Sequence, residues 1–308
     1  MSRVLVVGLN PAWQKILEFD LLSAGKVNRA KRLTEMASGE GLNAALILSR
    51  LGHEVWLLQI LGGTNGHKIA EFCKSAGISS LAYEIAQETR TTVALIDYAT
   101  RTATELTEPF SISSDDQAED RIVGLLTEQS LEFDAILYCG SVPDGLSPRI
   151  FWSVHRTIGS RISILGAVRS VPQELLGSVT CITINRHEFN DLEERLPCLR
   201  EGHGINCFLL LTDGANPARM LKVSPSHVEE HRYSLPALAR VLSSIGAGDT
   251  VMAGLAHFLL AGMAPVEACR HALAMGSASC LQLQPAHYAE SDYEKILSQI
   301  HVEGATSL

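Results

Sequence analysis

Short apolar runs that suit β-strands alternate along this chain with runs that suit α-helices. The strand-like runs are residues 4–7, 55–61, 135–138, 162–165, 181–184 and 208–211, and the helical runs include 42–51, 67–75 and 122–126. Gly52 and Gly77 follow two of the helical runs, at the position where a glycine commonly ends a helix. This alternation predicts βαβ units, and therefore an α/β fold in which helices cover both faces of a mainly parallel sheet.

Glycine or polar residues directly follow several of the strand-like runs. They are Gly8, Gly62, Gly140, Asn185 and Thr212. Because ligands of parallel α/β sheets bind beyond the carboxyl ends of the strands, we expect these residues to gather at one ligand-binding edge.

A glycine turn precedes a long apolar run near the end of the chain. Gly246, Ala247 and Gly248 are followed by Asp249, and residues 251–260 then have helical length and composition. At a helix N-terminus, free backbone N–H groups and the helix dipole attract anions such as phosphate. An aspartate beside such an anion hole could accept the proton of a hydroxyl during phosphoryl transfer. An ordinary N-cap in a loop gives the same pattern, so other motifs must decide between the two interpretations.

Composition limits the class of protein. The 308 residues are 46% hydrophobic and 19% charged, which suits a globular enzyme. The net charge of −9 argues against binding to nucleic acid or to an anionic membrane surface. The first apolar run is too short for a signal peptide, and no run has transmembrane length. The seven cysteines, at positions 73, 139, 181, 198, 207, 269 and 280, form no C-x-x-C pair, so we expect a cytoplasmic protein with reduced thiols.

A series of short motifs runs along nearly the whole chain. In order they are G-L-N-P-A at 8–12, G-K-V-N-R at 25–29, S-G-E-G-L-N at 38–43, L-G-G-T-N-G at 61–66, E-T-R-T at 88–91, T-E-L-T-E-P at 104–109, G-S-V-P at 140–143 and N-R-H-E at 185–188. Together with the glycine turn before Asp249, they resemble the motifs of the ribokinase/PfkB family of carbohydrate kinases. The resemblance is greatest to the phosphosugar branch of that family, which contains 1-phosphofructokinase and tagatose-6-phosphate kinase.

This resemblance implies a ribokinase-like three-layer α/β fold with a mainly parallel central sheet. It implies one domain over residues 1–308, with a small β-sheet lid formed by about residues 11–36 and 88–107. Short, partly polar strand-like runs without intervening helices fall in those two segments, at 15–19, 31–36, 91–98 and 101–106. A lid that closes over the sugar would keep water from the transferring phosphoryl group, whereas the alternative is an ordinary exposed hairpin region. In relatives the lid often forms the dimer contact, so the resemblance also implies a homodimer through the lid.

The resemblance implies the chemistry of a sugar or sugar-phosphate kinase with ATP and Mg²⁺ as cofactors. Asp249 matches the catalytic base of the family. The backbone amides of Gly246, Ala247 and Gly248 match its anion hole. No G-x-x-x-x-G-K-[ST] motif is present, so the chain is not a P-loop kinase.

The nucleotide and the metal ion are expected on neighbouring segments. By resemblance, Asn185, Thr212 and Gly214 belong to the nucleotide site, and Glu188 holds Mg²⁺ through water. The small-residue helix 272–281 falls where the family builds its nucleotide pocket, although small residues on a helix also permit close packing.

The acceptor sugar is expected between the lid and the first helix. The residues that match substrate-contacting positions of the family are Gln14, Lys26, Gly39, Gly41, Asn43 and Arg90. Arg90 matches the lid arginine that binds the substrate's phosphate in the phosphosugar branch, and the planar guanidinium of arginine can grip phosphate with two hydrogen bonds.

The acceptor motifs also depart from the family pattern. Gln14 stands where the family has an aspartate that binds sugar hydroxyls, and Glu40 stands where it has a lysine. Residues 165–168 likewise replace a D-T-S-G-like segment. A carboxylate near a bound phosphate would repel it unless the carboxylate is paired or faces solvent.

Three functions therefore stay open. The first is ATP- and Mg²⁺-dependent phosphorylation of a ketohexose phosphate, such as fructose 1-phosphate, fructose 6-phosphate or tagatose 6-phosphate. The second is the same chemistry on an unphosphorylated sugar or another small polyol, which Gln14 and Glu40 favour. The third is a catalytically weak homologue that binds nucleotide or sugar, against which the intact segment 246–249 argues.

Overall fold

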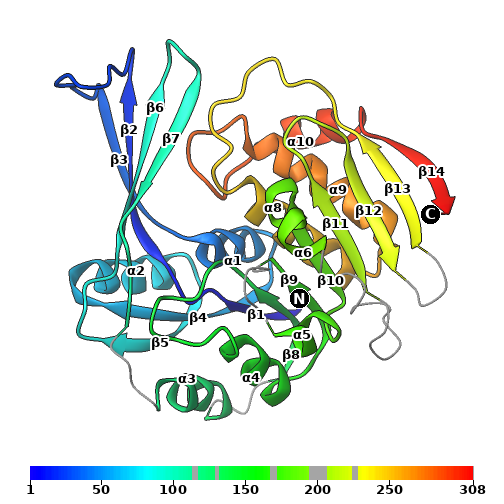
Figure 1. Cartoon of the computed structure of the whole chain (residues 1–308), viewed down its shortest axis with the longest axis horizontal. Coiled ribbons are helices and arrows are strands. Elements are labelled where there is room, and N and C mark those ends of the chain that lie inside the picture. Colours follow the sequence, from blue (N-terminus) through cyan, green and yellow to red (C-terminus); the bar gives the residue numbers. More distant parts are fainter. Residues whose placement is uncertain (113–116, 129–131, 167–171, 194–206, 224–227, 308) are drawn as a thin grey trace.

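A ten-stranded sheet forms the centre of this computed structural model, which describes residues 1–112, 117–128, 132–166, 172–193, 207–223 and 228–307 (Figure 1). Ala167 and Val168, in the segment that replaces a D-T-S-G-like motif, and Cys198 lie outside the described residues. The strands of this sheet are β1 (Arg3–Val7), β4 (Glu54–Gly62), β5 (Ser79–Ile85), β8 (Phe133–Tyr138), β9 (Ser160–Leu165), β10 (Cys181–Asn185), β11 (Phe208–Thr212), β12 (Ala218–Val223), β13 (Val228–Ser234) and β14 (His301–Ser307).

The strand order is β14-β13-β12-β11-β10-β9-β8-β1-β4-β5. The strands from β11 to β5 in this order pair in parallel, whereas β12, β13 and β14 continue the sheet in antiparallel fashion. The sheet is therefore mainly parallel, as the sequence analysis predicts. The antiparallel edge of β12 to β14 was not predicted.

Helices cover both faces of this sheet, which gives the predicted three layers. They are α1 (Glu40–Arg50), α2 (Gly63–Ser75), α3 (Ala118–Thr127), α4 (Ile150–Thr157), α5 (Gln173–Leu176), α6 (Arg186–Glu193), α8 (Ala247–Leu260), α9 (Pro265–Ser279) and α10 (Glu290–Leu297). Val4 and Val6 pack with α1, α2, α8, α9 and α10 on one face. Leu5 and Val7 pack with α3, α4 and α5 on the other, because successive side chains of a strand point to opposite faces.

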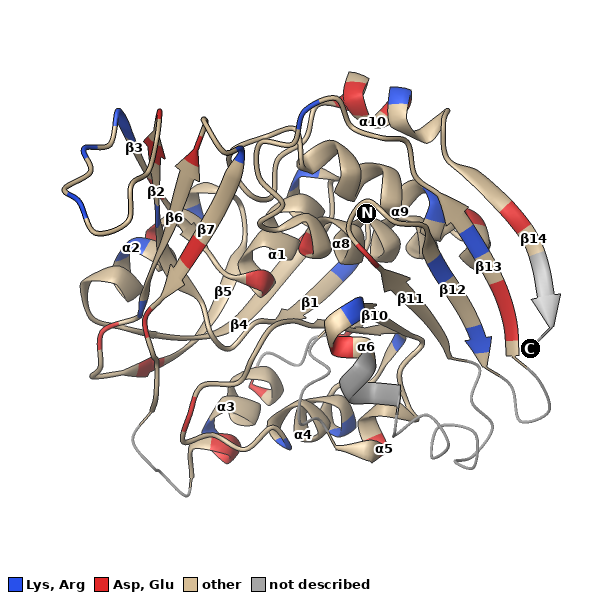
Figure 2. Ribbon diagram, turned by 45° about the horizontal axis from the view of Figure 1, so that its top comes forward, with Lys and Arg blue, Asp and Glu red and all other residues tan. Residues whose placement is uncertain are grey.

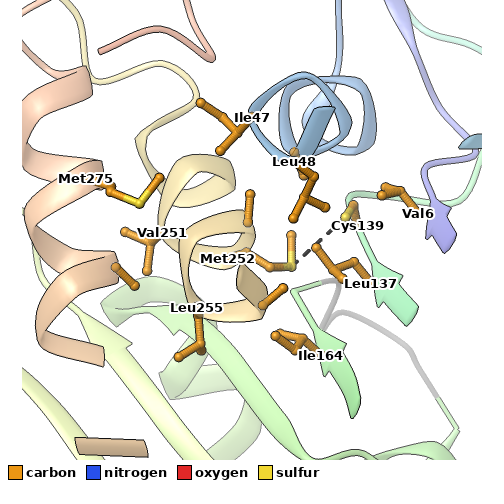
Figure 3. Packing of buried hydrophobic residues seen from close by; sticks show 14 of the residues in the cluster. Val6, Ile47, Leu48, Leu137, Cys139, Ile164, Val251, Met252, Leu255 and Met275 are labelled. Atoms are coloured by element: carbon orange, nitrogen blue, oxygen red, sulfur yellow. Dashed lines mark hydrogen bonds between the residues drawn. The ribbon is translucent and has the colours of Figure 1, made fainter. Parts of the chain in front are cut away.

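The helix α8 lies in the middle of its layer and is held by apolar contacts on several sides (Figure 3). Met252 points toward the sheet, where its sulfur lies 4.0 Å from the Cys139 sulfur. On the side of α9, a Cβ on Gly276 would lie 2.3 Å from Cγ2 of Val251, so the glycine allows the two helices to approach closely. The small residues of α9 thus serve close packing against α8.

A separate four-stranded sheet, with strand order β3-β2-β6-β7, stands apart from the large sheet at the upper left of Figure 1. Its strands are β2 (Ala12–Phe19), β3 (Arg32–Ser38), β6 (Thr91–Asp97) and β7 (Thr102–Thr107), and they come from the two segments expected to build a lid, although β3 extends to Ser38. One face of this small sheet carries Ile16, Ala94 and Ile96, which pack against Ile245 and Leu283 of the main body. Because Ile245 precedes Gly246, the small sheet contacts the start of the glycine turn.

Candidate active site

Asp249 lies in the first turn of α8 and is buried, with 8% of its surface exposed. Its Oδ2 accepts a hydrogen bond of 2.8 Å from Nδ2 of Asn43 on α1. Asn43 is itself buried, and its Oδ1 accepts a hydrogen bond of 3.3 Å from the Ser38 hydroxyl at the end of β3. Three elements distant in sequence thus fix the orientation of one carboxylate.

The glycine turn lies at the N-terminus of α8, as the sequence predicts. Gly246 is left-handed, with φ of 78°, and a Cβ at this position would lie 2.7 Å from the Cβ of Pro285. The N–H of Ala247 donates to the carbonyl of Ser244, and that of Thr250 donates to Gly246. The N–H groups of Gly248 and Asp249 belong to the first helical turn, where no acceptor four residues earlier lies within the helix. These amides and the helix dipole make the turn suitable for an anion.

A cavity of about 190 Å³ lies beside this turn. Gly248 and Asp249 line one side of it, and the ends of β10 and β11 supply Asn185 and Thr212. Glu188 of α6 also lines this cavity. The predicted base, two predicted nucleotide contacts and the predicted metal residue are therefore gathered around one space at the carboxyl edge of the sheet.

Asn185 and Glu188 form a reciprocal cap at the start of α6. The Asn185 side-chain oxygen accepts hydrogen bonds from the N–H groups of His187 and Glu188, at 2.9 Å and 3.0 Å. Glu188 Oε2 in turn accepts a hydrogen bond of 2.9 Å from the N–H of Asn185. This capping box fixes both side chains at the cavity and explains the spacing of the N-x-x-E motif.

A second cavity adjoins the ends of β1 and β8. Gly39 and Gly41, predicted to contact the substrate, line it together with Gly8, Arg90 and Glu40. A Cβ on Gly41 would lie 2.5 Å from Cα of Gly8, so the pair of glycines lets the start of α1 rest against the end of β1. Glu40 lines both cavities and so stands between the two predicted substrate sites.

Arg90 reaches from the beginning of the small sheet to the loop after β1. Its Nη2 donates to the carbonyl of Asn10 at 2.9 Å, and its Nε donates to the carbonyl of Pro11 at 3.4 Å. Burial lowers the pKa of Arg90, whereas the negative charges of Glu105 and Glu40 raise it. The guanidinium is thus a partly buried cation between two carboxyl groups.

The carboxyl groups around the site repel one another, and Figure 2 shows acidic segments on α1, α6 and β7. Burial and the charge of Glu188 raise the pKa of Glu40 to about 7, although Arg90 and a backbone hydrogen bond from Gly140 oppose the shift. The side chain of Glu40 is exposed to solvent, and it lines both cavities.

The pKa of Asp249 is raised well above its ordinary value. Burial is the main cause, and the charges of Glu40, Glu105 and Glu188 add to it. The hydrogen bond from Asn43 acts in the opposite direction and lowers the pKa of Asp249. A carboxylate with a raised pKa is a stronger base than a solvated aspartate, which suits proton transfer near neutral pH.

Three predicted site residues lie away from these cavities. Lys26 is exposed in the turn between β2 and β3, and Gly214 is exposed in the turn between β11 and β12, with φ of 57°. Gln14 is on β2 and is 1% exposed, on the face of the small sheet that also carries Ile16. Its amide oxygen and nitrogen have no hydrogen-bond partner in the described part of the chain.

Two residues beside the site have no role predicted from the sequence. Asn10 lines the second cavity, and its Nδ2 donates to the Ser141 hydroxyl at 2.9 Å. Glu105 of β7 influences the pKa values of Asp249, Glu40 and Arg90. Both lie in recognised motifs, N-P-A and T-E-L-T-E-P, so the motif matches themselves were the available signal.

Oxygen donors at the first cavity are compatible with magnesium. Mg²⁺ prefers oxygen ligands, keeps several waters and is usually held by one or two carboxylates together with substrate phosphates. Glu188 and Asp249 supply carboxylate oxygens there. Among the described residues no group of three or more His, Cys, Asp or Glu side chains could hold a metal ion alone, so any magnesium site would need water and phosphate oxygens as well.

The three-layer fold, the glycine turn with its buried aspartate and the small separate sheet define a ribokinase-like carbohydrate kinase. Residues 1–291 match the profile described as pfkB family carbohydrate kinase, and the chain belongs to this family. It is therefore a sugar or sugar-phosphate kinase.

The similar proteins of known name include two kinases of phosphosugars. Tagatose-6-phosphate kinase of Staphylococcus epidermidis is 23% identical over 314 residues, which cover 97% of this chain and 99% of that protein. 1-Phosphofructokinase of Haemophilus influenzae is 24% identical over 326 residues and 98% of each chain.

Solved structures agree with the fold. Phosphofructokinase-2 of Escherichia coli, in complex with potassium, has a TM-score of 0.80 at 16% identity and covers 97% of this chain and 99% of its own. Ribokinase of Thermotoga maritima has a TM-score of 0.74 at 16% identity and covers 97% of this chain and 100% of its own. None of the helices in the described part of the chain has the length and apolar character that a membrane crossing requires.

Proposed function

We propose that this protein transfers the terminal phosphoryl group of ATP, with Mg²⁺, to a hydroxyl of a ketohexose or of its phosphate ester, and that Asp249 is the general base. One observation carries the proposal: the Asp249 carboxylate is buried at the N-terminus of α8, accepts a hydrogen bond from Asn43 and lies beside the first-turn amides of that helix. Gly248 and Asp249 line the same cavity, which supports a general base and an anion-stabilising turn that act on one bound phosphoryl group.

Each group has a distinct role in this proposal. The acceptor hydroxyl would give its proton to Asp249 as it attacks. The N–H groups of Gly248 and Asp249 would stabilise the negative charge of the transferring group. Asn185 and Thr212, across the cavity, would contact the nucleotide, with Gly214 on the turn that follows. When bound, Mg²⁺ would neutralise phosphate charge, and Glu188 would hold it through water.

The acceptor has two candidates. An acceptor that is already phosphorylated is supported by the names of the relatives and by Arg90 at the second cavity. An unphosphorylated sugar or small polyol is supported by Glu40, which lines both cavities with a carboxyl group. The buried and oriented Asp249 argues against a catalytically weak binding protein in either case.

The test is ADP release from MgATP against fructose, tagatose, fructose 1-phosphate, fructose 6-phosphate and tagatose 6-phosphate. We expect steady turnover with at least one acceptor, and a decrease of about 10²- to 10⁴-fold in Asp249→Asn with ATP binding retained. ATP binding by calorimetry serves as the folding control. Near-normal turnover in Asp249→Asn would remove the base from the proposal.

Two further proposals concern the assembly and the location of the protein. We propose a homodimer through the small sheet, whose outer face carries exposed apolar side chains such as Leu33 and Leu106. A solved relative, phosphofructokinase-2 of Escherichia coli, is described as tetrameric in an inhibited form. A cytoplasmic location and the absence of nucleic-acid partners stay predictions from charge and cysteine pattern.

A further inference from the structure

Glu40 occupies the position where the two substrate cavities meet. It is the first residue of α1, and it lines the cavity of Asp249 as well as the cavity of Arg90. A Cβ added to Gly140 would lie 3.4 Å from the Glu40 Cδ, so the carboxyl group rests against the loop after β8. A molecule that spans from Asp249 to Arg90 must therefore pass Glu40.

The charges near Glu40 are mostly negative. Asp249, Glu188 and Glu105 all interact electrostatically with the shared site, and ATP would add further negative charge. Arg90 is the cation among the groups that influence Glu40, and its guanidinium already donates to the carbonyls of Asn10 and Pro11. One partly engaged arginine therefore faces two or more carboxyl groups, which leaves little net attraction for a phosphate ester.

We propose that the acceptor is a polyhydroxylated molecule whose end near Glu40 is uncharged, and that Glu40 is a specificity-determining residue that rejects a phosphate group there. This inference rests on the proposed kinase function and chooses between its two acceptor candidates. The Glu40 carboxylate accepts hydrogen bonds from hydroxyl groups and repels phosphate.

The experiment measures the binding of D-fructose, fructose 1-phosphate and fructose 6-phosphate by calorimetry with a non-hydrolysable MgATP analogue present. Wild type, Glu40→Gln and Glu40→Lys are compared at pH 8, above the Glu40 pKa of about 7. Glu84→Gln is the matched control, because it removes one negative charge from an exposed position on β5. Unfolding midpoints show whether each variant folds.

We expect Glu40→Gln to bind at least one phosphate ester about tenfold more tightly than wild type does, with a larger gain in Glu40→Lys and none in Glu84→Gln. Unchanged ester binding in both Glu40 variants overturns the inference. Tighter binding of an ester than of D-fructose by wild type overturns it as well. ADP release is recorded in parallel: a gain in ester binding without turnover in wild type would support the inference about the ligand and count against the proposed kinase reaction.

Discussion

Nδ2 of Asn43 and Oδ2 of Asp249 are 2.8 Å apart, although the two residues are separated by 206 positions in the chain. The hydrogen bond joins the first turn of α1 to the first turn of α8. This hydrogen bond favours the ionised form of Asp249, whereas burial and the neighbouring negative charges oppose ionisation. The orientation and basicity of Asp249 therefore depend on how the two helices begin.

Replacement of Asn43 is expected to change the pH dependence of catalysis. Asn43→Ala removes the bond that lowers the pKa of Asp249, so this pKa rises. Because the base must be ionised, activity increases with pH through this pKa, and the acidic limb of the kcat profile should move to higher pH. A hydrogen bond to a charged group contributes about 1.5–3 kcal/mol, which corresponds to a shift of about 1–2 pH units.

The measurement is kcat between pH 5 and 9 with the acceptor found by the ADP assay. Glu40→Gln provides a variant of opposite sign, since the Glu40 charge raises the pKa of Asp249 and its removal should move the limb to lower pH. If both variants shift the limb in the same direction, or neither does, Asp249 is not the group that the profile reports.

The contact between Gly8 and Gly41 is expected to tolerate no side chain. A Cβ on Gly41 would lie 2.5 Å from Cα of Gly8, and because both are backbone positions, α1 itself would have to move. Overpacking of this kind costs about 1–3 kcal/mol, and movement of α1 would also displace Glu40 and Asn43. Gly41→Ala should therefore lower the free energy of unfolding and turnover together.

The matched control is Gly124→Ala on α3, where an added Cβ meets nothing within 4 Å. There the substitution should raise the free energy of unfolding by about 0.5–1 kcal/mol, because alanine favours the helix. Urea unfolding of the two variants beside wild type tests both signs. An unchanged free energy of unfolding in Gly41→Ala would contradict the prediction and would show that the start of α1 can move without cost.

The stability of the main body is expected to fall on acidification through a histidine pair. His53 Nε2 and His257 Nδ1 lie 2.9 Å apart between the end of α1 and α8. Burial lowers the pKa of both, and for His53 the neighbouring His257 lowers it further. Below the ordinary histidine pKa of about 6.5, the unfolded chain therefore binds more protons than the folded chain does. The stabilisation of the folded state by the two neutral histidines is present above that pH and is lost as the pH falls.

The test compares urea midpoints at pH 7.5 and 5.5. His257→Gln should reduce the decrease between the two values, whereas His67→Gln, at an exposed position on α2, should leave it as in wild type. An equal decrease in wild type and His257→Gln would assign the acid sensitivity to other groups.

The sequence predicted the parallel half of the fold because its strands are continuous apolar runs such as β1 and β11, buried on both faces. The antiparallel edge was not predicted, because β13 has the sequence V-E-E-H-R-Y-S. Its charged residues interrupt the apolar run that indicates a strand elsewhere in the chain. The edge strand β14 is likewise partly polar, with the sequence H-V-E-G-A-T-S.

The site was predictable where residues follow strands or begin helices. One cavity is lined by Asn185, Thr212, Gly248 and Asp249. Such residues lie close together because the carboxyl ends of parallel strands are at the same edge of the sheet. Lys26, by contrast, was placed by motif alone, and the turn that carries it leads away from both cavities. The influence of Glu105 on Asp249 depends on how the small sheet sits against the body, which no local pattern encodes.

The outer face of the small sheet is expected to hold two copies of the chain together. The register places Leu33, Leu17 and Leu95 side by side across three strands, with Val93 and Leu106 in the adjacent row. This face is opposite to the one that packs on the body through Ile16 and Ala94, because successive residues of a strand alternate between faces. Leu33 and Leu106 are 52% and 54% exposed, which is unfavourable for apolar side chains unless a partner covers them.

Leu33→Glu and Leu106→Glu together should therefore shift the protein from dimer to monomer, since each variant would bring a carboxylate to an apolar contact. Light scattering after size exclusion measures the mass at several concentrations. Val241→Glu, an exposed apolar position on the main body, is the control and should keep the dimer. A wild-type protein that is monomeric at every concentration would contradict the prediction, and a dimer that survives both leucine substitutions would place the interface elsewhere.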